Sequence, residues 1–446
     1  MGSAGVSPST GAVAPAGATG AAVILIMIVE LINTGSELLL GRVLNTNQQW
    51  LCRQLAELGC VVSRQVAVPD TGPDIQGAVR ESLGRADLVI TTGGLGPTSD
   101  DLTRDLIARL LGRSLREDPQ VLAAIQAYFA SRQRAMPESN RLQAMVPEGA
   151  RVLHNAFGTA PGLALEIKPN PYRAGGEGSW LVMLPGPPRE LRPMFTNQVV
   201  PLLRTLLPPE ARFACHTLRT TGLGESWVQE RIALALTRLV ASGLDLGYCA
   251  RPGQVDVRLS ARGPQGESLV AEAEKVVREL LGGSCYGTED EELEQVIIRL
   301  LTARQATLAV AESCTGGCIA HRLTNVPGAS AVFLAGLVTY SNAAKQQFLG
   351  VPAQTLAAHG AVSEPVARAM AEGARRATGA QYGIAVTGIA GPSGGTPDKP
   401  VGTVFIAVAS PRETTVERQC NPTDRETFKQ VTAQQAMDLL RRTLRD

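Results

Sequence analysis

The stretch from Thr91 to Asp105 combines glycines with carboxylates and reads TTGGLGPTSDDLTRD. An apolar strand pattern runs into this turn, and we expect a helix to begin near Ser99 or Asp100. Such a turn lets backbone N–H groups approach a phosphate closely, and the helix end adds partial positive charge. The glycines of this expected phosphate turn are Gly93, Gly94 and Gly96.

Three aspartates follow, namely Asp100, Asp101 and Asp105. At this spacing Asp101 and Asp105 would share one face of the expected helix. Carboxylates beside a phosphate need a cation, and oxygen ligands suit a divalent ion such as Mg²⁺, Mn²⁺ or Co²⁺. The alternative is a helix capped by aspartate after a glycine turn, which capping and helix-dipole preferences explain alone.

Two more glycine turns belong to the same region. The first reads TGSE, holds Gly35 and Glu37, and leads on to Asn47; the second reads LPGPPRE and holds Gly186. The carboxyl ends of parallel strands lie along one edge of a sheet, where ligands bind. We therefore expect the three turns to line one pocket.

A second group of residues indicates acyl transfer. A strand pattern ends at Ser313, and Gly316, Gly317 and a helix follow. A nucleophilic serine at such a turn has free backbone N–H groups beside it, which stabilise the oxyanion of acyl transfer. The alternative is a serine that caps the helix, the more frequent use of serine at this position.

A serine nucleophile also needs a base, and no histidine lies in a convincing partner motif. The segment TYSNAAK offers Tyr340 and Lys345 instead, and lysine occurs at only five positions in the chain. The two side chains converge if Tyr340 ends a strand and Lys345 lies in the next helix. Lysine acts as a base only when burial or a nearby positive charge lowers its pKa.

A glycine-rich loop after another strand pattern completes this group. It reads TGIAGPSGG and favours phosphate binding, although chain reversal alone explains any single turn of this kind. The residues expected to hold substrate here are Thr387, Gly388, Gly391, Gly394 and Gly395.

The elements that must position these residues alternate between strands and helices in two regions of the chain. This alternation predicts α/β sheets that are covered by helices on both faces. The expected strands are Ile24–Ile32, Val61–Val68, Leu88–Thr92, Leu163–Ile167, Trp180–Leu184, Thr307–Ala311, Phe333–Tyr340, Tyr382–Thr387 and Gly402–Ala409.

Between these regions the pattern changes to a small α+β unit. It contains the strands Phe213–Thr221 and Gln254–Ala261 and the helices Glu225–Leu239 and Ser268–Leu281. The predicted fold class is therefore α/β, with two three-layer domains joined by an α+β connector. The expected bounds are a disordered leader at 1–22, domains at 23–205 and 289–446, and the connector at 206–288.

Composition limits the classes of function. The 446 residues carry 42 Lys and Arg against 41 Asp and Glu, which leaves no global basic field for nucleic acid. No segment reaches membrane-spanning length, and eight dispersed cysteines fit a reducing compartment, so a cytoplasmic location is expected. Trp50, Trp180 and Trp227 are expected in hydrophobic cores.

The N-terminal motifs resemble a known family. GSELLLG, NTN, TTGGLGPTSDD and LPGPPRE are similar to the molybdopterin-binding-type domain at the N-terminus of CinA family proteins. The resemblance implies metal-dependent ADP-ribose pyrophosphatase activity, which yields AMP and ribose 5-phosphate. A divalent ion would polarise phosphoryl oxygens and activate water.

The C-terminal motifs resemble the nicotinamide mononucleotide (NMN) amidase domain of the same family. AESCTGG, VPGAS, TYSNAAK, HGAVSE, TGIAGPSGG and KPVGTV carry the match. It implies hydrolysis of NMN to nicotinate mononucleotide and ammonia, without a cofactor. Ser313 would be the nucleophile, Tyr340 and Lys345 would activate it, and Thr387 with its loop would hold substrate.

This sequence also departs from the family pattern. Ala335 stands where a second glycine is usual, and Asn421-Pro422-Thr423-Asp424-Arg425 replaces an aromatic-x-Gly-Asp-Arg pattern. Arg425 would still bind the ribose phosphate.

The middle unit resembles the KH-like connector of these proteins. Its turn Thr221–Glu225 is similar to a GxxG loop, but no basic cluster accompanies it, so a linker or dimer role is expected rather than RNA binding. The resemblance thus implies a homodimer that acts on small nucleotides. The alternative function is a non-catalytic nucleotide- or pterin-binding partner in competence or DNA-damage responses.

Overall fold

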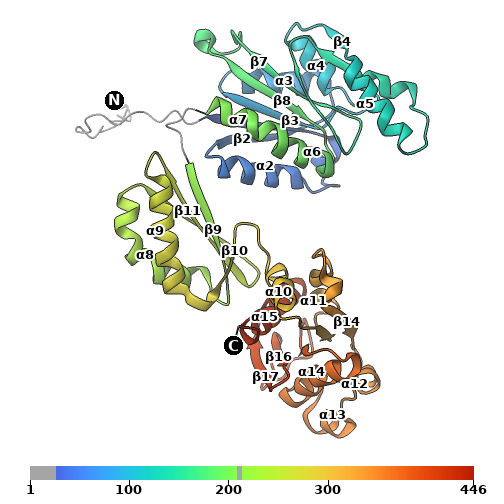
Figure 1. Ribbon diagram of the computed structural model, residues 1–446, viewed down its shortest axis with the longest axis vertical. Helices are drawn as coiled ribbons and strands as arrows, with labels where there is room; N and C mark the ends of the chain where they lie inside the picture. The colour runs from blue at the N-terminus through green and yellow to red at the C-terminus, as the bar shows by residue number, and fades with distance from the viewer. Residues whose placement is uncertain (1–26, 208–212, 446) are drawn as a thin grey trace, which may run out of the picture. The chain divides into compact units, whose positions relative to one another are not determined.

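The computed structural model describes residues 27–207 and 213–445, in two units that meet in sequence between Arg212 and Phe213. The expected leader at 1–22 lies outside the described residues. Figure 1 shows both units, with labels on many of their helices and strands. Within the described residues, no helix is long and apolar enough to cross a membrane.

A six-stranded sheet, in the order β2-β1-β3-β8-β7-β6, forms the centre of the first unit. Strands β2, β1, β3 and β8 are parallel, whereas β7 is antiparallel to β8 and β6 to β7. The strands are β1 Ile28–Thr34, β2 Val61–Val68, β3 Leu88–Thr92, β6 Arg151–Leu153, β7 Gly162–Ile167 and β8 Ser179–Leu184. A separate pair is formed by β4 Leu115–Glu117 and β5 Met145–Pro147.

Successive residues of this sheet point into different cores. In β3, Leu88 and Ile90 pack on the side of α2 and α6, whereas Val89 packs on the side of α3 and α4 (Figure 1). This alternation is what a sheet between two helical layers requires. The helices are α1 Ser36–Leu39, α2 Thr46–Glu57, α3 Gly72–Leu83, α4 Thr103–Leu110, α5 Pro119–Ala130, α6 Pro188–Met194 and α7 Val200–Leu206.

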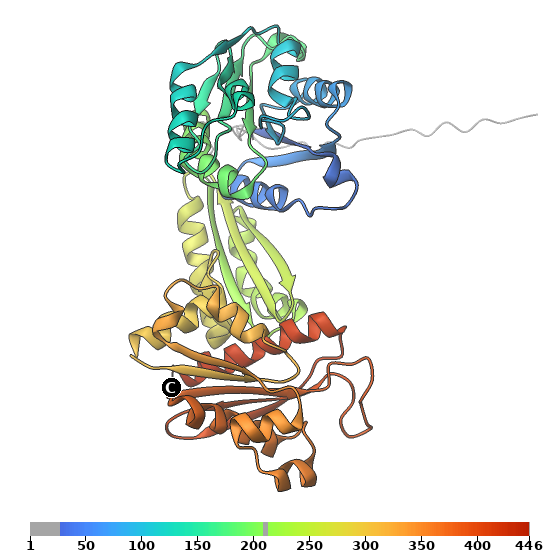
Figure 2. The ribbon, with the colours of Figure 1, turned by 90° about the vertical axis from the view of Figure 1, so that its right-hand side faces the viewer.

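The second unit begins with an antiparallel sheet in the order β10-β11-β9-β12, which two helices cover on one face (Figure 2). Its elements are β9 Phe213–Thr221, α8 Glu225–Ala241, β10 Leu244–Arg251, β11 Gln254–Arg262, α9 Gly266–Leu281 and β12 Cys285–Thr288. The prediction that Trp227 is a core residue is wrong, because its side chain is 60% exposed. The core face of α8 instead presents Val228, Ile232 and Leu236.

The rest of the second unit is a mixed sheet in the order β14-β13-β15-β16-β17, parallel up to β15 and antiparallel beyond it. Helices α10, α11 and α15 cover one face, and α12, α13 and α14 the other (Figure 2). The strands are β13 Leu308–Glu312, β14 Phe333–Val338, β15 Tyr382–Gly388, β16 Thr403–Ala409 and β17 Thr414–Cys420. The helices are α10 Leu293–Ala303, α11 Cys318–Thr324, α12 Asn342–Leu349, α13 Ala353–His359, α14 Glu364–Thr378 and α15 Arg425–Thr443. The predicted fold class, with two three-layer α/β domains and an α+β connector, is therefore confirmed.

Candidate active sites

The first candidate site is an open cavity of about 390 Å³ at the carboxyl ends of β1, β3 and β8. All three predicted glycine turns line it, so the structure brings together residues from distant parts of the chain. The predicted residues that line it are Gly35, Glu37, Gly93, Gly94, Gly96, Asp100, Asp101 and Gly186.

Two of these glycines are required by space and by backbone conformation. Gly94 has φ +67°, and a Cβ there would collide with the Thr103 hydroxyl. Gly93 has φ +97°, and a Cβ would come within 2.7 Å of the Thr34 carbonyl oxygen. Residues with a side chain rarely adopt these backbone conformations. Because Gly93 and Gly94 have no side chain, the backbone of the turn borders the cavity directly.

The aspartates of this segment are not arranged as the sequence predicts. Helix α4 begins at Thr103, whose N–H donates to the Gly94 carbonyl, so Asp101 lies before the helix and does not share a helical face with Asp105. The Asp101 carboxylate accepts from the Thr98 N–H at 2.9 Å. Asp105 does not line the cavity, and its carboxylate accepts from the Arg104 guanidinium at 2.7 Å. The prediction that Asp101 and Asp105 share one face of a helix is therefore wrong, and Asp105 does not join Asp100 and Asp101 at the cavity.

Asn47 does not line this cavity but contacts one of the turns that do. Its amide donates to the Gly186 carbonyl at 2.5 Å and its side chain is buried, so it fixes the third turn. Its Oδ1 atom is buried without a hydrogen-bond partner among the described residues. The sequence predicts Asn47 near the site, but only the structure shows that its amide donates a hydrogen bond to the Gly186 carbonyl.

Several lining residues are absent from the sequence prediction, including Asp70, Gln143, Thr159 and Glu190. Glu190 is 7% exposed and accepts from the Asn155 amide at 2.8 Å. Glu190 is the last residue of the LPGPPRE segment, so its position after a glycine turn could have indicated that it lines the site. No pattern near Thr159 or Gln143 indicates the site.

The charge of the cavity is strongly negative. The carboxylates of Glu37, Asp70, Asp100, Asp101 and Glu190 line it, and within residues 27–207 and 213–445 no lysine or arginine does. A hydrogen bond from Thr98 lowers the pKa of Asp100, which favours its ionised form. A phosphate would be repelled here unless a cation accompanied it.

The donor set fits a divalent ion that a substrate phosphate helps to hold. Among the described residues, no three His, Cys, Asp or Glu side chains form a group that could hold a metal by themselves. Mg²⁺, however, commonly binds through one or two carboxylates together with substrate phosphates. Asp100 and Asp101 are the predicted ligands that this cavity retains.

The second candidate site centres on a contact between Lys345 and Ser313. The lysine Nζ donates to the Ser313 Oγ at 3.0 Å, and also to the carbonyls of Thr339 at 2.8 Å and Tyr340 at 3.2 Å. Lys345 is 1% exposed, and this burial lowers the pKa of its amine. The structure therefore brings together a serine and a lysine whose environment disfavours its charged form.

The turn that carries Ser313 is held by Glu312, which the sequence prediction did not single out. The buried Glu312 carboxylate accepts from the N–H groups of Gly317 at 3.0 Å, Ile319 at 3.1 Å and Ala320 at 2.8 Å. Glu312 thus occupies these three N–H groups at the start of α11. A glutamate between an apolar strand and two glycines was the signal for this role.

Tyr340 and Arg425 form a second contact beside the serine. The Tyr340 side chain is exposed, and its hydroxyl accepts from Arg425 at 2.9 Å. Arg425 also donates to the Gly391 carbonyl at 2.9 Å. The phenol of Tyr340 therefore joins the glycine loop and Arg425, whereas only its backbone carbonyl contacts Lys345.

Thr387 and the remaining glycines complete this site. The Thr387 hydroxyl donates to the Ala361 carbonyl at 2.8 Å, and its strand neighbour Val386 accepts from the Ser313 N–H at 3.1 Å. The loop carries Gly388, Gly391, Gly394 and Gly395, and the serine turn carries Gly316 and Gly317. A Cβ on Gly316 would lie 3.8 Å from the Lys429 Nζ, which places a cation that the prediction missed beside this turn.

Cys314 is not a competing nucleophile. Its side chain is buried, and burial raises the pKa of its thiol to about 12. The reactive form of cysteine is the thiolate, which is negligible at neutral pH under these conditions. Ser313 is therefore the nucleophile candidate of this turn.

Comparison with known proteins identifies the family. Residues 30–205 match the probable molybdopterin binding domain, residues 215–287 the damage-inducible protein CinA KH domain, and residues 290–444 the CinA C-terminal domain. A putative competence-damage inducible protein of Symbiobacterium thermophilum is 46% identical over 433 residues, which cover 94% of this chain and 99% of that protein. The chain belongs to the CinA family.

A second relative agrees with this assignment. A CinA-like protein of Akkermansia muciniphila is 46% identical over 410 residues, covering 92% of this chain and 95% of that one. Among solved structures, the competence/damage inducible protein CihA from Agrobacterium tumefaciens is 40% identical, with a TM-score of 0.33. The match covers 34% of this chain and 94% of the Agrobacterium chain.

Proposed function

We propose that the C-terminal domain of this CinA-family protein hydrolyses the carboxamide of NMN through an acyl-serine. The observation that carries the proposal is the 3.0 Å contact between the buried Lys345 amine and the Ser313 hydroxyl. Because burial lowers the pKa of Lys345, the amine can accept the serine proton and act as a general base.

The chemical steps follow from this pair. The neutral Lys345 removes the Ser313 proton while Oγ bonds to the carboxamide carbon. The resulting lysine ammonium then protonates the departing nitrogen, which leaves as ammonia and produces a nicotinoyl ester on the serine. Lys345, again neutral, removes a proton from water, whose oxygen attacks the ester carbon. The lysine ammonium then returns this proton to the Ser313 oxygen as the ester bond breaks, which releases nicotinate mononucleotide and restores Ser313. Arg425, Tyr340 and the loop from 387 to 395 would hold the ribose phosphate.

Ammonia release from NMN tests this proposal. Ser313→Ala and Lys345→Ala should each abolish the release, since either variant removes one partner of the proton transfer. Circular dichroism would verify that both variants fold. Retention of turnover in both would exclude the serine mechanism.

We also propose that the N-terminal domain is a metal-dependent ADP-ribose pyrophosphatase. Support comes from glycine turns that border an acidic cavity in which no described lysine or arginine takes part, an arrangement that accepts a pyrophosphate only with a cation. When bound, the divalent ion would neutralise and polarise the phosphoryl oxygens. Asp100 and Asp101 would hold it, and the backbone of the 93–96 turn would position the phosphates. Formation of AMP and ribose 5-phosphate from ADP-ribose, with and without Mg²⁺, Mn²⁺ or Co²⁺, tests this.

The match of residues 30–205 to a probable molybdopterin binding domain favours a second candidate function. In it, the N-terminal domain binds a nucleotide or pterin without turnover and serves an interaction role. Calorimetry that detects ADP-ribose binding, combined with no cleavage in any of the three metals, would support this candidate over the pyrophosphatase.

A further inference from the structure

A cavity of about 520 Å³ in the C-terminal domain lies away from the serine site. Ser313 follows the end of β13, and β15 is parallel to β13, so the serine lies at the carboxyl end of these strands. The cavity lies at their other end, because its lining includes Ala380, which precedes β15, and Ser410, which follows the antiparallel strand β16. A ligand in this cavity therefore leaves the serine site open.

Charged side chains from two segments gather in this cavity. Helix α14 packs against β16 and β17, and residues spaced by four, seven and eight positions along it share the face that borders the cavity (Figure 1). The turn between β16 and β17 supplies further lining. The charged residues are Arg368, Glu372, Arg375, Arg376, Arg412 and Glu413. Four guanidinium groups against two carboxylates leave an excess of two positive charges.

Two of the arginines fix the wall of the cavity. Arg368 donates to the Thr414 carbonyl and Arg375 to the Ser410 carbonyl, so both tie the turn between β16 and β17 to α14. The Thr414 hydroxyl also donates to the Glu372 carboxylate at 3.0 Å. The wall is therefore fixed before a ligand arrives, which reduces the ordering cost of binding.

The positive charges of this cavity are incompletely compensated. Arg412 is exposed, and its guanidinium makes no hydrogen bond, ion pair or ring contact within the part of the chain that the structure describes. Arg375 forms no ion pair with a described carboxylate, and its buried Nε has no hydrogen-bond partner there. Arg376 is 62% exposed and reaches Glu372 only at 4.0 Å. Guanidinium groups without a close carboxylate attract an anion, most strongly where they are partly buried.

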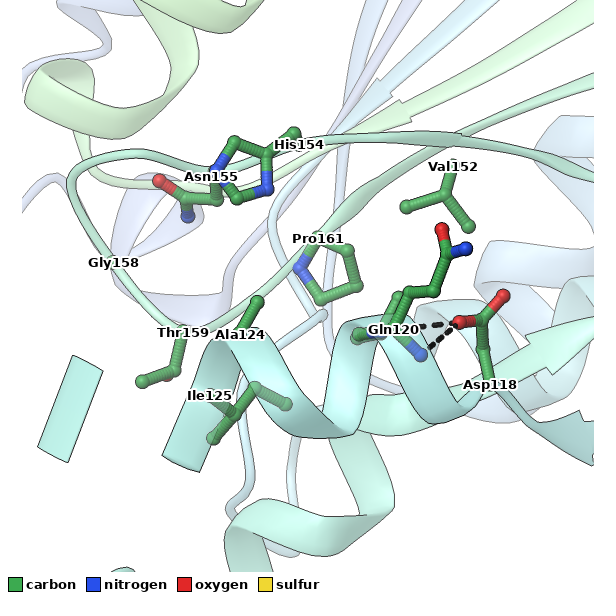
Figure 3. Close-up of a pocket in the computed structure, with 11 residues that line it drawn as sticks. Asp118, Gln120, Ala124, Ile125, Val152, His154, Asn155, Gly158, Thr159 and Pro161 are labelled. Carbon is green, nitrogen blue, oxygen red and sulfur yellow. Dashed lines mark hydrogen bonds between the residues drawn. The ribbon is translucent and has the colours of Figure 1, made fainter. Parts of the chain in front are cut away.

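The cavity beside α5 in the first unit shows that such a lining is not general in this chain. It measures about 190 Å³ and lies between α5 and the segment 152–161 (Figure 3). Asp118 is the only described Asp, Glu, Lys or Arg that lines it, and it accepts from the N–H groups of Gln120 and Val121. The acidic cavity likewise contains no described lysine or arginine. The arginines beside α14 are thus a local feature and do not follow from composition alone.

We propose that this cavity binds a phosphate dianion, either as inorganic phosphate or as the phosphate of a nucleotide. A planar guanidinium presents paired N–H donors that match two phosphate oxygens, a geometry that a lysine ammonium lacks. A phosphate monoester carries about −1.5 to −2 charges at neutral pH, which matches the positive excess of the lining. Arg376 and Arg412 hold the oxygens, and Arg375 adds its charge from the wall. The site is independent of both proposed activities.

Protection of individual arginines tests the site. Phenylglyoxal modifies accessible guanidinium groups, and mass spectrometry of the digested full chain reads each arginine separately. Inorganic phosphate or AMP, at constant ionic strength, should slow the modification of Arg376 and Arg412 about threefold at about twice the Kd of the ligand, because only free sites react. Arg304, an exposed arginine after α10 that does not line the cavity, should react at an unchanged rate.

Substitutions then identify the groups that hold the phosphate. Arg412→Gln should raise the ligand concentration that half-protects Arg376 by about tenfold or more, as the loss of a charge-assisted hydrogen bond requires. Arg304→Gln is the matched control, since this side chain is also exposed and has no partner among the described residues, and it should change that concentration by less than about twofold. Arg425→Gln alters the serine site and should leave the protection of Arg376 unchanged.

The outcomes decide both the site and its ligand. Equal protection by inorganic phosphate and AMP supports free phosphate as the ligand, whereas protection by AMP alone supports a nucleotide phosphate. Absence of protection by both, equal slowing of Arg304, or an unchanged half-protecting concentration in Arg412→Gln overturns the proposal. Loss of protection in Arg425→Gln also overturns it, because the ligand then belongs to the serine site. None of these results depends on hydrolysis of NMN or ADP-ribose.

Discussion

Lys345 places an amine among oxygen atoms in the interior of the C-terminal domain, bonded to Ser313 and to two backbone carbonyls. Desolvation disfavours the ammonium, so the pKa of Lys345 in the folded chain lies below its ordinary value. In the unfolded chain the same amine titrates near 10.4. Between these two pKa values the unfolded chain binds the extra proton, and rising pH therefore stabilises the folded state.

This difference gives the first prediction. The free energy of unfolding of the native protein, relative to Lys345→Met, should rise with pH between the lowered pKa of Lys345 in the folded chain and the ordinary lysine value of about 10.4. Urea denaturation at several pH values measures it. The kcat/KM for NMN should also rise with pH through a pKa below that of free lysine. Stability curves for the two proteins that stay parallel over the whole range would contradict the buried-amine interpretation.

The second prediction separates the three aspartates. Asp100 and Asp101 line the acidic cavity, whereas Asp105 is paired with Arg104 outside it. Asp100→Asn and Asp101→Asn should each raise the Mn²⁺ concentration for half-maximal ADP-ribose cleavage by about tenfold or more, as loss of a carboxylate ligand requires. Asp105→Asn should change it by less than about twofold. A larger effect for Asp105→Asn than for the other two would exclude this assignment.

At the scale of elements, the start of α11 depends on a single side chain. The Glu312 carboxylate accepts three backbone N–H groups and joins the end of β13 to the first turn of the helix. Because Ser313 is the next residue, this contact also sets the position of the nucleophile candidate. The same strand-to-helix connection thus combines local stability with the geometry of the site.

The third prediction concerns this connection. Glu312→Gln replaces one acceptor oxygen by an NH₂ group that faces backbone donors, and should lower the free energy of unfolding by about 2–3 kcal/mol. The control is Glu364→Gln, whose exposed pair with Arg368 on α14 should contribute less than about 1 kcal/mol. Urea denaturation compares them, and ammonia release from NMN should fall only in Glu312→Gln. Equal stabilities of the two variants would refute the structural role of Glu312.

At the scale of the whole molecule, the two proposed activities lie in different units and need different chemistry. The acidic cavity is built from residues before 212, whereas Ser313 and Lys345 belong to the unit after it. A charge balance of +1 fits small nucleotide substrates, with local glycine turns and carboxylates in place of a global field.

The fourth prediction uses this separation. Dialysis against a chelator should remove ADP-ribose cleavage by the full chain and leave its release of ammonia from NMN unchanged, and added Mn²⁺ should restore the first activity. Parallel assays of both products on one preparation measure this. Loss of both activities on chelation would show that the amidase site also needs the metal.

Much of the fold follows from local patterns. Val61–Val68, Leu88–Thr92 and Phe213–Thr221 are predicted with the bounds that the structure shows. Strand β10, Leu244–Arg251, was not predicted, because it is the edge strand of a small sheet, is mostly not buried and lacks a continuous apolar run. Helix α4 begins later than predicted, because the Thr103 N–H bonds to Gly94 rather than within a longer helix.

The sequence by itself determined which residues follow which strand, and therefore the turns that line the acidic cavity and the serine turn of the C-terminal domain. Only the tertiary structure decided which side chains meet: Lys345 reaches Ser313 across 32 positions, and Arg425 reaches Tyr340 across 85. Periodicity specifies positions along one element, whereas contacts between elements depend on strand order and helix packing. The lowered pKa of Lys345 has the same origin, because desolvation exists only once neighbouring elements have excluded water.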